Sequence, residues 1–152
     1  MKKITALFLL CVFFTGCKNT QNNAELLRFH KEIDTFCNNI KEIDSSINAI
    51  SNISADEDGL KQATSELLNQ LDLLKDEFLK FSNIDFPEEY DYLEKIADES
   101  ADYMTEAVNA YHKTYEDNYT VSMEEYALEN YGRAYKRVRV IIDVLNGKET
   151  TS

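Results

Sequence analysis

The chain contains two histidines, which are the side chains most often used for metal binding and for proton transfer near neutral pH. His30 and His112 each have a carboxylate four residues further on, at Asp34 and Glu116, so each pair would share one face of a helix. Neither histidine has a glutamate three residues before it, which is the spacing found in di-iron helical bundles. A single pair of this kind is typical of a solvated helix surface, so we predict no metal site at either histidine.

A short run of oxygen-bearing side chains occurs at Ser54, Asp56 and Asp58, before Gly59. Calcium-binding loops of the EF-hand type alternate their ligands in this way, but they begin with aspartate and carry a bidentate glutamate at the twelfth position. In this chain the first position is Ser54 and the twelfth is Ser65. The pattern therefore predicts at most weak cation binding by the carboxylates of this turn.

Other chemical motifs are also missing from the sequence. It has no glycine-rich phosphate loop, no Cys-x-x-Cys pair and no nucleophile with an evident histidine partner. We therefore predict no catalytic residues, no metal and no organic cofactor, and we expect that the protein is not an enzyme.

The first seventeen residues combine a charged start, an apolar stretch and a cysteine. Lys2 and Lys3 precede an apolar run over residues 4–14, which is too short for a stable membrane span. Thr15 and Gly16 then come directly before Cys17, and this ending resembles the signal peptides of bacterial lipoproteins. The resemblance implies cleavage after residue 16 and attachment of a diacylglycerol to Cys17, with or without an N-acyl chain such as palmitate. An ordinary secretory signal or an uncleaved anchor is the alternative.

The same resemblance implies a location and a division of the chain. Two or more acyl chains are enough for stable anchoring, so Cys17 would hold the protein on the extracytoplasmic side of the cell membrane. In a cell with two membranes, Lys18 after the cysteine is similar to signals for release to the outer one. We expect a signal peptide over residues 1–16, a tether over 17–23, a folded domain over 24–147 and a flexible tail over 148–152.

The domain that remains is strongly acidic. Removing residues 1–16 takes two lysines from a chain of 152 residues with a formal net charge of −12, and so leaves 136 residues at −14. This charge repels phosphate backbones, so we expect no nucleic-acid partner. Cys37 is the only thiol besides Cys17 in that domain, and we expect it to be half-buried on a helix. A disulfide-linked dimer through Cys37 is the less favoured alternative.

From residue 24 onward, apolar residues recur at alternating steps of three and four, which is typical of amphipathic helices that pack on one another. The first predicted helix begins at Asn22 and ends in the polar stretch 52–59, and the second runs from Leu60 to just before Asn83. Their predicted core stripes are Leu26, Phe29, Ile33, Phe36, Ile40, Ile43, Ile47 and Ile50, and then Leu60, Thr64, Leu67, Leu71, Leu74, Phe78 and Phe81.

Two further helix starts carry capping signals. Asp85 and Glu88 flank Pro87 in the pattern of a capping box with proline in the first turn, and Ser122 and Glu125 form a second such box. Val121 and Tyr126 have the spacing of a hydrophobic staple around the second box, and Asn146-Gly147 is a typical helix stop. The predicted stripes are Tyr90, Leu93, Ala97, Ser100, Met104, Val108, Tyr111 and Tyr115, and then Ala127, Tyr131, Ala134, Val138, Ile141 and Leu145.

Four such helices joined by short loops favour an all-α fold, an antiparallel up-down-up-down four-helix bundle. Charge agrees with this topology, since the acidic segment 88–102 of the third helix would lie beside the basic segment 133–139 of the fourth. The alternative is a three-helix bundle from which the first helix projects as a coiled-coil arm.

A tether at Cys17 would place the start of the first helix beside the membrane, so the turns at 52–59 and 116–122 would face away from it. All nine tyrosines lie between Tyr90 and Tyr135, and several of them are near these turns. Tyrosine offers rigid, amphipathic contact area, so we predict a partner-binding tip. Its candidate residues are Asp56, Asp58, Asp117, Tyr119, Glu124 and Tyr126. The alternative is that these acids only cap helices and keep this end soluble.

The sequence therefore favours a lipid-anchored, non-catalytic interaction module, an adaptor or an inhibitor, whose partner is another envelope or secreted protein. A bundle that binds a small ligand or a cation is the alternative. Such a bundle would have a cavity lined by Tyr131, Tyr90 or Met104. Gly132 would allow either close helix packing or the entry of a small ligand, with close packing preferred.

Overall fold

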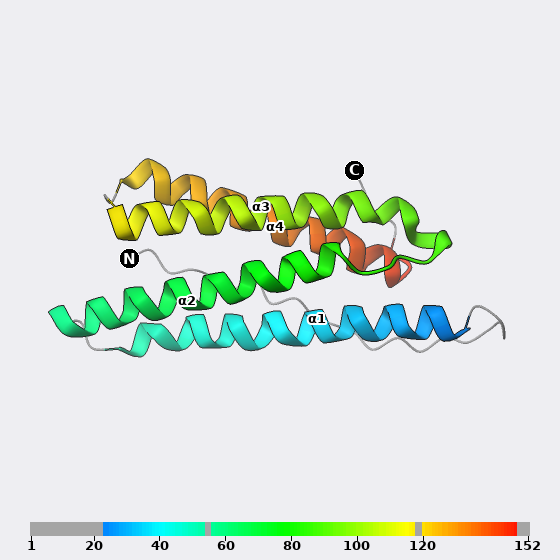
Figure 1. The fold of residues 1–152 in the computed structure, drawn as a ribbon, viewed down its shortest axis with the longest axis horizontal. Coiled ribbons are helices and arrows are strands. Elements are labelled where there is room, and N and C mark those ends of the chain that lie inside the picture. Colours follow the sequence, from blue (N-terminus) through cyan, green and yellow to red (C-terminus); the bar gives the residue numbers. More distant parts are fainter. Residues whose placement is uncertain (1–22, 54–55, 118–119, 149–152) are drawn as a thin grey trace.

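The computed structural model describes residues 23–53, 56–117 and 120–148, and every regular element within them is helical. Four long helices, α1 (Asn23–Ala49), α2 (Glu57–Ser82), α3 (Glu94–His112) and α4 (Val121–Leu145), run alternately in opposite directions (Figure 1). Shorter turns extend them, namely the 3-10 turns η1 (Ile50–Asn52) and η2 (Glu88–Leu93) and the π-helical turn η3 (Lys113–Asp117). The predicted four-helix bundle is confirmed. The predicted signal peptide, Cys17 and nearly all of the predicted tail lie outside the described residues.

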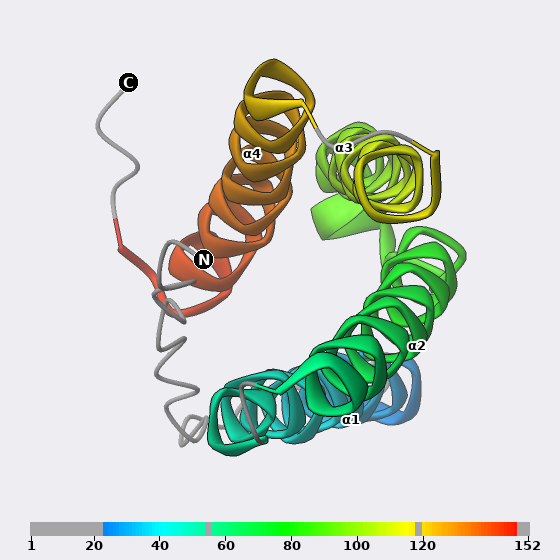
Figure 2. The same cartoon turned by 90° about the vertical axis from the view of Figure 1, so that its left-hand side faces the viewer.

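Helices that are neighbours in the chain are also neighbours in space, so that α1 packs on α2, α2 on α3 and α3 on α4 (Figure 2). The backbones of α1 and α4 approach each other less closely, and long side chains bridge them. Between α3 and α4, the Arg137 guanidinium lies 2.6 Å from the Glu99 carboxylate and packs over the Tyr103 ring. This ion pair confirms the predicted pairing of acidic and basic helix faces.

Helix α1 belongs to the core along most of its length. Phe29, Ile33 and Phe36 are each at most 3% exposed, and the Phe36 ring stacks on Phe81 of α2 with a centroid distance of 4.2 Å. Burial of apolar side chains to this extent is the main stabilising contribution to a bundle of this size. The alternative of a projecting first helix is therefore wrong. Cys37 is 3% exposed, so it is more deeply buried than expected.

Helix α2 begins one turn earlier than predicted. The Asp56 carboxylate accepts a 2.8 Å hydrogen bond from the Gly59 amide and caps the helix, so that residues 57–59 are helical rather than part of the turn. As a result Leu60 is an internal helix position. It is 47% exposed although it was predicted to be in the core.

Helix α3 begins later than predicted. Pro87 is followed by the 3-10 turn η2, in which the Tyr90 amide donates to the Pro87 carbonyl at 2.7 Å, and the α-helix starts only at Glu94. The predicted capping box of Asp85 and Glu88 is wrong, because the Asp85 carboxylate is held by Arg28 of α1 instead. The end of α3 widens into the π-helical turn η3, where the predicted core position Tyr115 is only half-buried.

Helix α4 is capped two residues before the predicted position. Thr120 has an extended backbone, and its hydroxyl accepts from the Met123 amide at 3.3 Å. The predicted box at Ser122 is therefore wrong, as is the staple, since Val121 is the first helical residue and is 55% exposed. The predicted stop is confirmed. Gly147 has φ +68°, the left-handed conformation that glycine adopts at the end of a helix.

Candidate functional site

Those predicted tip residues that the structure describes belong to segments at the end of the bundle opposite the start of α1 (Figure 1). Asp56 caps α2 and Asp58 lies in its first turn, while Glu124 and Tyr126 lie in the first two turns of α4. Asp117 ends η3, and Tyr119 lies outside the described residues. We call this end of the molecule, which holds the start of α2, the end of α3 and the start of α4, the distal end.

Tyr126 turns toward α3 and is 44% exposed. Its hydroxyl donates to the Glu106 carboxylate at 3.2 Å, which fixes the ring on the outer surface between α3 and α4. The acidic residues that begin α2 also have local roles, since Asp56 is the helix cap and Glu57 pairs with Lys61 at 2.9 Å. Helix capping thus accounts for part of the acidic character of the distal end, and Tyr126 remains available for contact through its exposed side.

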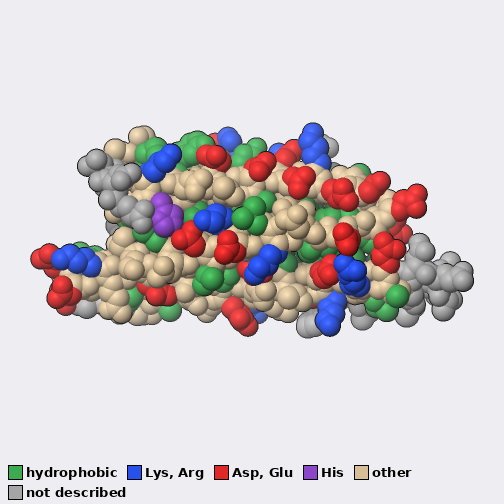
Figure 3. Space-filling model, in the orientation of Figure 1, with side chains coloured by type: hydrophobic (Ala, Val, Ile, Leu, Met, Phe, Trp, Pro, Cys, Tyr) green, Lys and Arg blue, Asp and Glu red, His purple; other side chains and the backbone are tan. Residues whose placement is uncertain are grey.

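A groove at the distal end separates the start of α2 from the end of α3. It has a volume of about 530 Å³ and is open to solvent. Figure 1 shows that the first turns of α2 extend past the end of α3, and Figure 3 shows the same step in the molecular surface. The residues that line this groove include Leu60, Lys61, Thr64 and Leu68 of α2, with His112 and Tyr115 opposite them.

Leu60 is the most exposed apolar side chain of the groove. It lies seven residues before Leu67 and eleven before Leu71, so the three share one face of α2, and that face points into the core further along. Leu67 and Leu71 are at most 7% exposed, whereas Leu60 is 47% exposed because the facing helices end before they cover it. The core stripe of α2 thus continues into the groove without a partner among the described residues.

One wall of the groove is fixed by polar contacts. His112 Nε2 lies 3.1 Å from Asp72 Oδ2, and Lys75 Nζ lies 2.7 Å from Asp72 Oδ1. Burial alone would raise the pKa of the Asp72 carboxyl, but the hydrogen bonds and charges of Lys75 and His112 outweigh it and lower that pKa. Tyr115 on the same side has a raised pKa, through burial first and then the nearby Glu124 carboxylate. The contacts with Asp72 thus fix His112 at the wall of the groove.

A buried polar cluster that the sequence did not suggest joins α1 to α4. The Tyr131 and Tyr135 hydroxyls donate to the same oxygen of Asp44, at 3.0 and 2.8 Å, and the two rings stack with centroids 4.9 Å apart. Burial raises the pKa of Asp44 more than the two hydrogen bonds lower it, and burial likewise raises the pKa of both phenols. Among the described residues, the nearby Tyr111 hydroxyl is buried without a hydrogen-bond partner.

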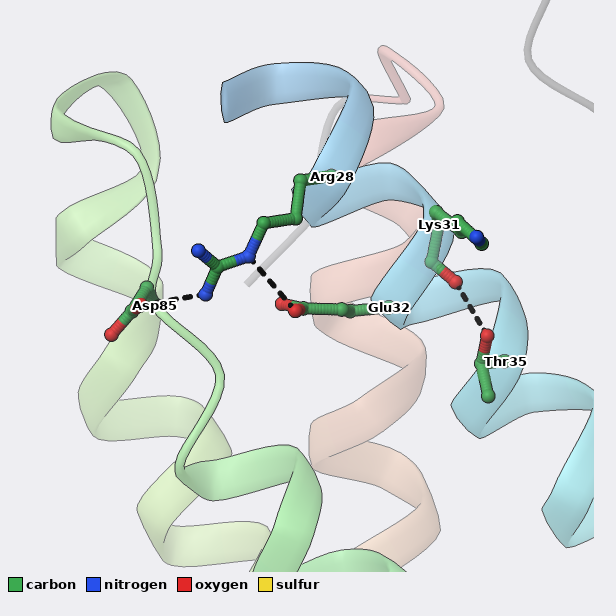
Figure 4. A network of polar contacts seen from close by, with 5 residues as sticks. All are labelled: Arg28, Lys31, Glu32, Thr35 and Asp85. Atoms are coloured by element: carbon green, nitrogen blue, oxygen red, sulfur yellow. Dashed lines mark hydrogen bonds and ion pairs between the residues drawn. The ribbon is translucent and has the colours of Figure 1, made fainter. Parts of the chain in front are cut away.

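A second, smaller hollow of about 330 Å³ lies between α1 and the end of α2, at the opposite end of the bundle. Arg28 bridges its rim, donating to Glu32 at 3.1 Å and to Asp85 at 2.9 Å (Figure 4). Within it, Lys80 and Asn39 both donate to Glu77, and these bonds lower the pKa of the Glu77 carboxyl although its burial acts the other way. The cations and anions in this hollow are paired with one another.

The positions that were expected to line an internal ligand cavity do not line either of these two hollows. Met104 is fully buried in the core, and Tyr131 is committed to Asp44. A side chain at Gly132 would meet nothing within 4 Å, so the expected close packing at this glycine is wrong. Within the described part of the chain, no group of three or more His, Cys, Asp or Glu side chains could hold a metal ion. None of the described helices combines the length and hydropathy needed to cross a membrane.

Comparisons of the chain with protein-family models, with curated proteins and with solved structures found no match.

Proposed function

We propose that the protein is a lipid-anchored, non-catalytic interaction module of the bacterial envelope, and that its distal end binds another envelope or secreted protein. The observation that carries this proposal is the groove at the distal end, where Leu60 is exposed on the core face of α2. An apolar side chain in this position gains stabilisation only if another molecule covers it.

The lipid anchor is supported by the residues around Cys17 and by the distance from it to the fold. Helix α1 begins at Asn23, six residues after Cys17, and six residues span at most about 20 Å. The start of α1 would therefore lie beside the membrane. Since α1 has 27 residues, its other end would stand about 40 Å further out, where an envelope or secreted protein can reach the groove.

A binding role is favoured over catalysis by the polar contacts of His112, which lines the groove, with residues beside it. The imidazole of His112 and the carboxylate of Asp72 contact each other, and Lys75 also pairs with Asp72. Ion pairs of this kind orient a surface and exclude unsuitable partners, and they contribute more to specificity than to affinity.

The anchor is tested by replacing Cys17 with serine in the native cell and separating membrane from soluble fractions. We expect the natural chain to incorporate the labelled fatty acid and to remain in the membrane fraction. We expect C17S to incorporate no label and to appear in the soluble fraction. Incorporation of label into C17S, or membrane retention of C17S equal to that of the natural chain, would contradict lipidation at this residue.

The interaction is tested with a photo-reactive amino acid at Tyr126, which is 44% exposed at the distal end. The matched control is Tyr92, a 59% exposed tyrosine of η2 at the opposite end of the bundle. We expect one discrete protein adduct from position 126 in living cells and none from position 92. Equal adducts from both positions, or no adduct from position 126, would overturn the proposed function.

A further inference from the structure

The groove at the distal end has the shape and the chemistry to receive one particular kind of structure. We propose that it seats a basic amphipathic helix of the partner protein, an inference that rests on the proposed function. Three features of the groove carry it, namely the spacing of its lining residues, its exposed apolar position and the charge around it.

The lining residues of α2 favour a helix as the occupant. They run from Glu57 to Asn69 at helical spacings, so the groove follows the side of α2 over about 18 Å. A helix of about twelve residues has the same length, and side chains spaced three and four apart pack into the grooves of a neighbouring helix. In the bundle itself, α3 occupies this side of α2 until it ends at His112. The partner helix would continue that packing.

The exposed apolar position requires an apolar face on the partner helix. Leu60 is 47% exposed, and Leu68 beside it is 7% exposed at the base of the groove. Tyr115 lines the opposite side and is half-buried. A leucine-sized side chain placed in the groove would cover the exposed part of Leu60, as anchor residues cover apolar surface at protein interfaces.

The charge around the groove selects a basic partner and argues against a second copy of this chain. Among the side chains that the structure describes at the distal end, five carry a carboxylate (Asp56, Glu57, Asp58, Glu124 and Glu125) and two are lysines (Lys61 and Lys113). Two distal ends brought together would place these carboxylates face to face, which is repulsive. A helix with lysines or arginines beside its apolar face would instead meet opposite charge, and the acidic domain as a whole would attract it.

The proposal is tested by a photo-reactive amino acid at Leu60, with Leu73 as the matched control. Both are exposed leucines of α2, at 47% and 51%, and only Leu60 lines the groove. The cross-linked partner peptide is identified by mass spectrometry. We expect an adduct from position 60 alone, to a segment of positive net charge with apolar residues at spacings of three and four. An adduct to an acidic segment, to a segment of alternating strand-like pattern or to a second copy of this chain would overturn the proposal.

A second test separates this proposal from the proposed function. Thr64→Trp fills the groove, Leu60→Ser removes its apolar surface, and Leu73→Trp places a tryptophan on α2 outside the groove. With the photo-reactive residue kept at Tyr126, we expect the adduct to fall about tenfold in T64W and in L60S and to be unchanged in L73W. Each variant is first checked for the natural helix content and thermal transition, and L60S alone is used for the test if T64W does not fold.

An undiminished adduct in L60S would overturn the groove proposal but leave the proposed function standing. If position 126 gives no adduct in the chain without these substitutions, both the groove proposal and the proposed function are overturned.

Discussion

Asp44 is a side chain whose contribution to the stability of the fold depends on pH. Its carboxylate is half-buried between α1 and α4 and accepts hydrogen bonds from two tyrosines. Burial raises its pKa above the value in the unfolded chain. A carboxyl with a raised folded-state pKa favours folding when it is protonated, so its contribution is fully present below the unfolded pKa and is lost as the pH rises through the folded pKa.

Asp44→Asn should therefore stabilise the protein at neutral pH. The asparagine oxygen can still accept from Tyr131 and Tyr135, but no charge is buried. We expect thermal denaturation followed by circular dichroism to give a melting temperature a few degrees higher for D44N at about pH 7, with the gain shrinking toward about pH 4. Asp34→Asn, at an exposed position of the same helix, is the control and should show no such gain. A lower melting temperature for D44N at about pH 7 would show that the charged form of Asp44 strengthens the two hydrogen bonds by more than its burial costs.

The candidate site could be predicted from the sequence only in part. Asp56, Asp58, Glu124 and Tyr126 were assigned to the correct end because helix order and alternation place them there. Leu60 was missed as a surface residue because its periodicity matches the core. Its exposure arises from the unequal ends of α2 and α3, and a stripe of apolar residues carries no information about where the facing helix stops.

Among the helices, α4 has a start that can be tested directly. Thr120 supplies the cap through its hydroxyl, whereas Ser122 is exposed in the first turn. We expect Thr120→Ala to lower the free energy of unfolding by about 1 kcal/mol, as the loss of a threonine cap generally does. Urea denaturation measures this loss, and Ser122→Ala should change it by less than about 0.5 kcal/mol. Equal losses for the two variants would place the cap elsewhere.

The helices could be predicted from the sequence, whereas their capping residues could not, and this difference has a physical cause. Periodicity reports which residues are buried over many turns, so the four helices and most of their core stripes could be predicted from it. A cap depends on one hydrogen bond, and Ser122 and Asp85 are as suitable in type as Thr120 and Asp56. Asp85 does not cap a helix because its carboxylate accepts a hydrogen bond from Arg28, which lies 57 residues away in the chain. The residues next to Asp85 in the sequence do not indicate that contact.

The contact between Arg28 and Asp85 ties the start of α1 to the segment after α2, but its expected energy is small. Its side chains are 64% and 82% exposed, so water and salt screen the pair. A double-mutant cycle with Arg28→Ala and Asp85→Ala, followed by urea denaturation, should give little coupling energy between the two side chains. We expect this coupling to fall when salt is raised to about 1 M. A larger coupling that does not respond to salt would contradict this account.

At the scale of the whole molecule, the four helices share one core and should unfold together. Phe36 of α1 stacks on Phe81, and Phe78 of α2 contacts Tyr135 of α4 with centroids 5.5 Å apart. Aromatic contacts thus run from the first helix to the last. A domain of this size with one continuous core generally unfolds in a single cooperative transition.

Phe36→Ala should therefore weaken the entire bundle and not α1 alone. We expect a loss of about 3–5 kcal/mol, with one transition that coincides when followed by far-ultraviolet circular dichroism and by tyrosine absorbance. The tyrosines report on α3 and α4, since they all lie at or after Tyr90. A biphasic transition, with helix content lost before the tyrosine signal changes, would instead show that α1 separates from a stable remainder.

The burial of Cys37 has a consequence for the kinetics of the bundle. Its thiol is 3% exposed among residues of the core, so a thiol reagent reaches it when the packing around it opens. The rate of labelling at low reagent concentration then reports the equilibrium population of the opened form, and at high concentration it reports the rate of opening. The labelling of Cys37 thus measures how often the core opens. A partner helix that binds only the closed bundle would slow labelling at low reagent concentration, because it reduces the population of the opened form.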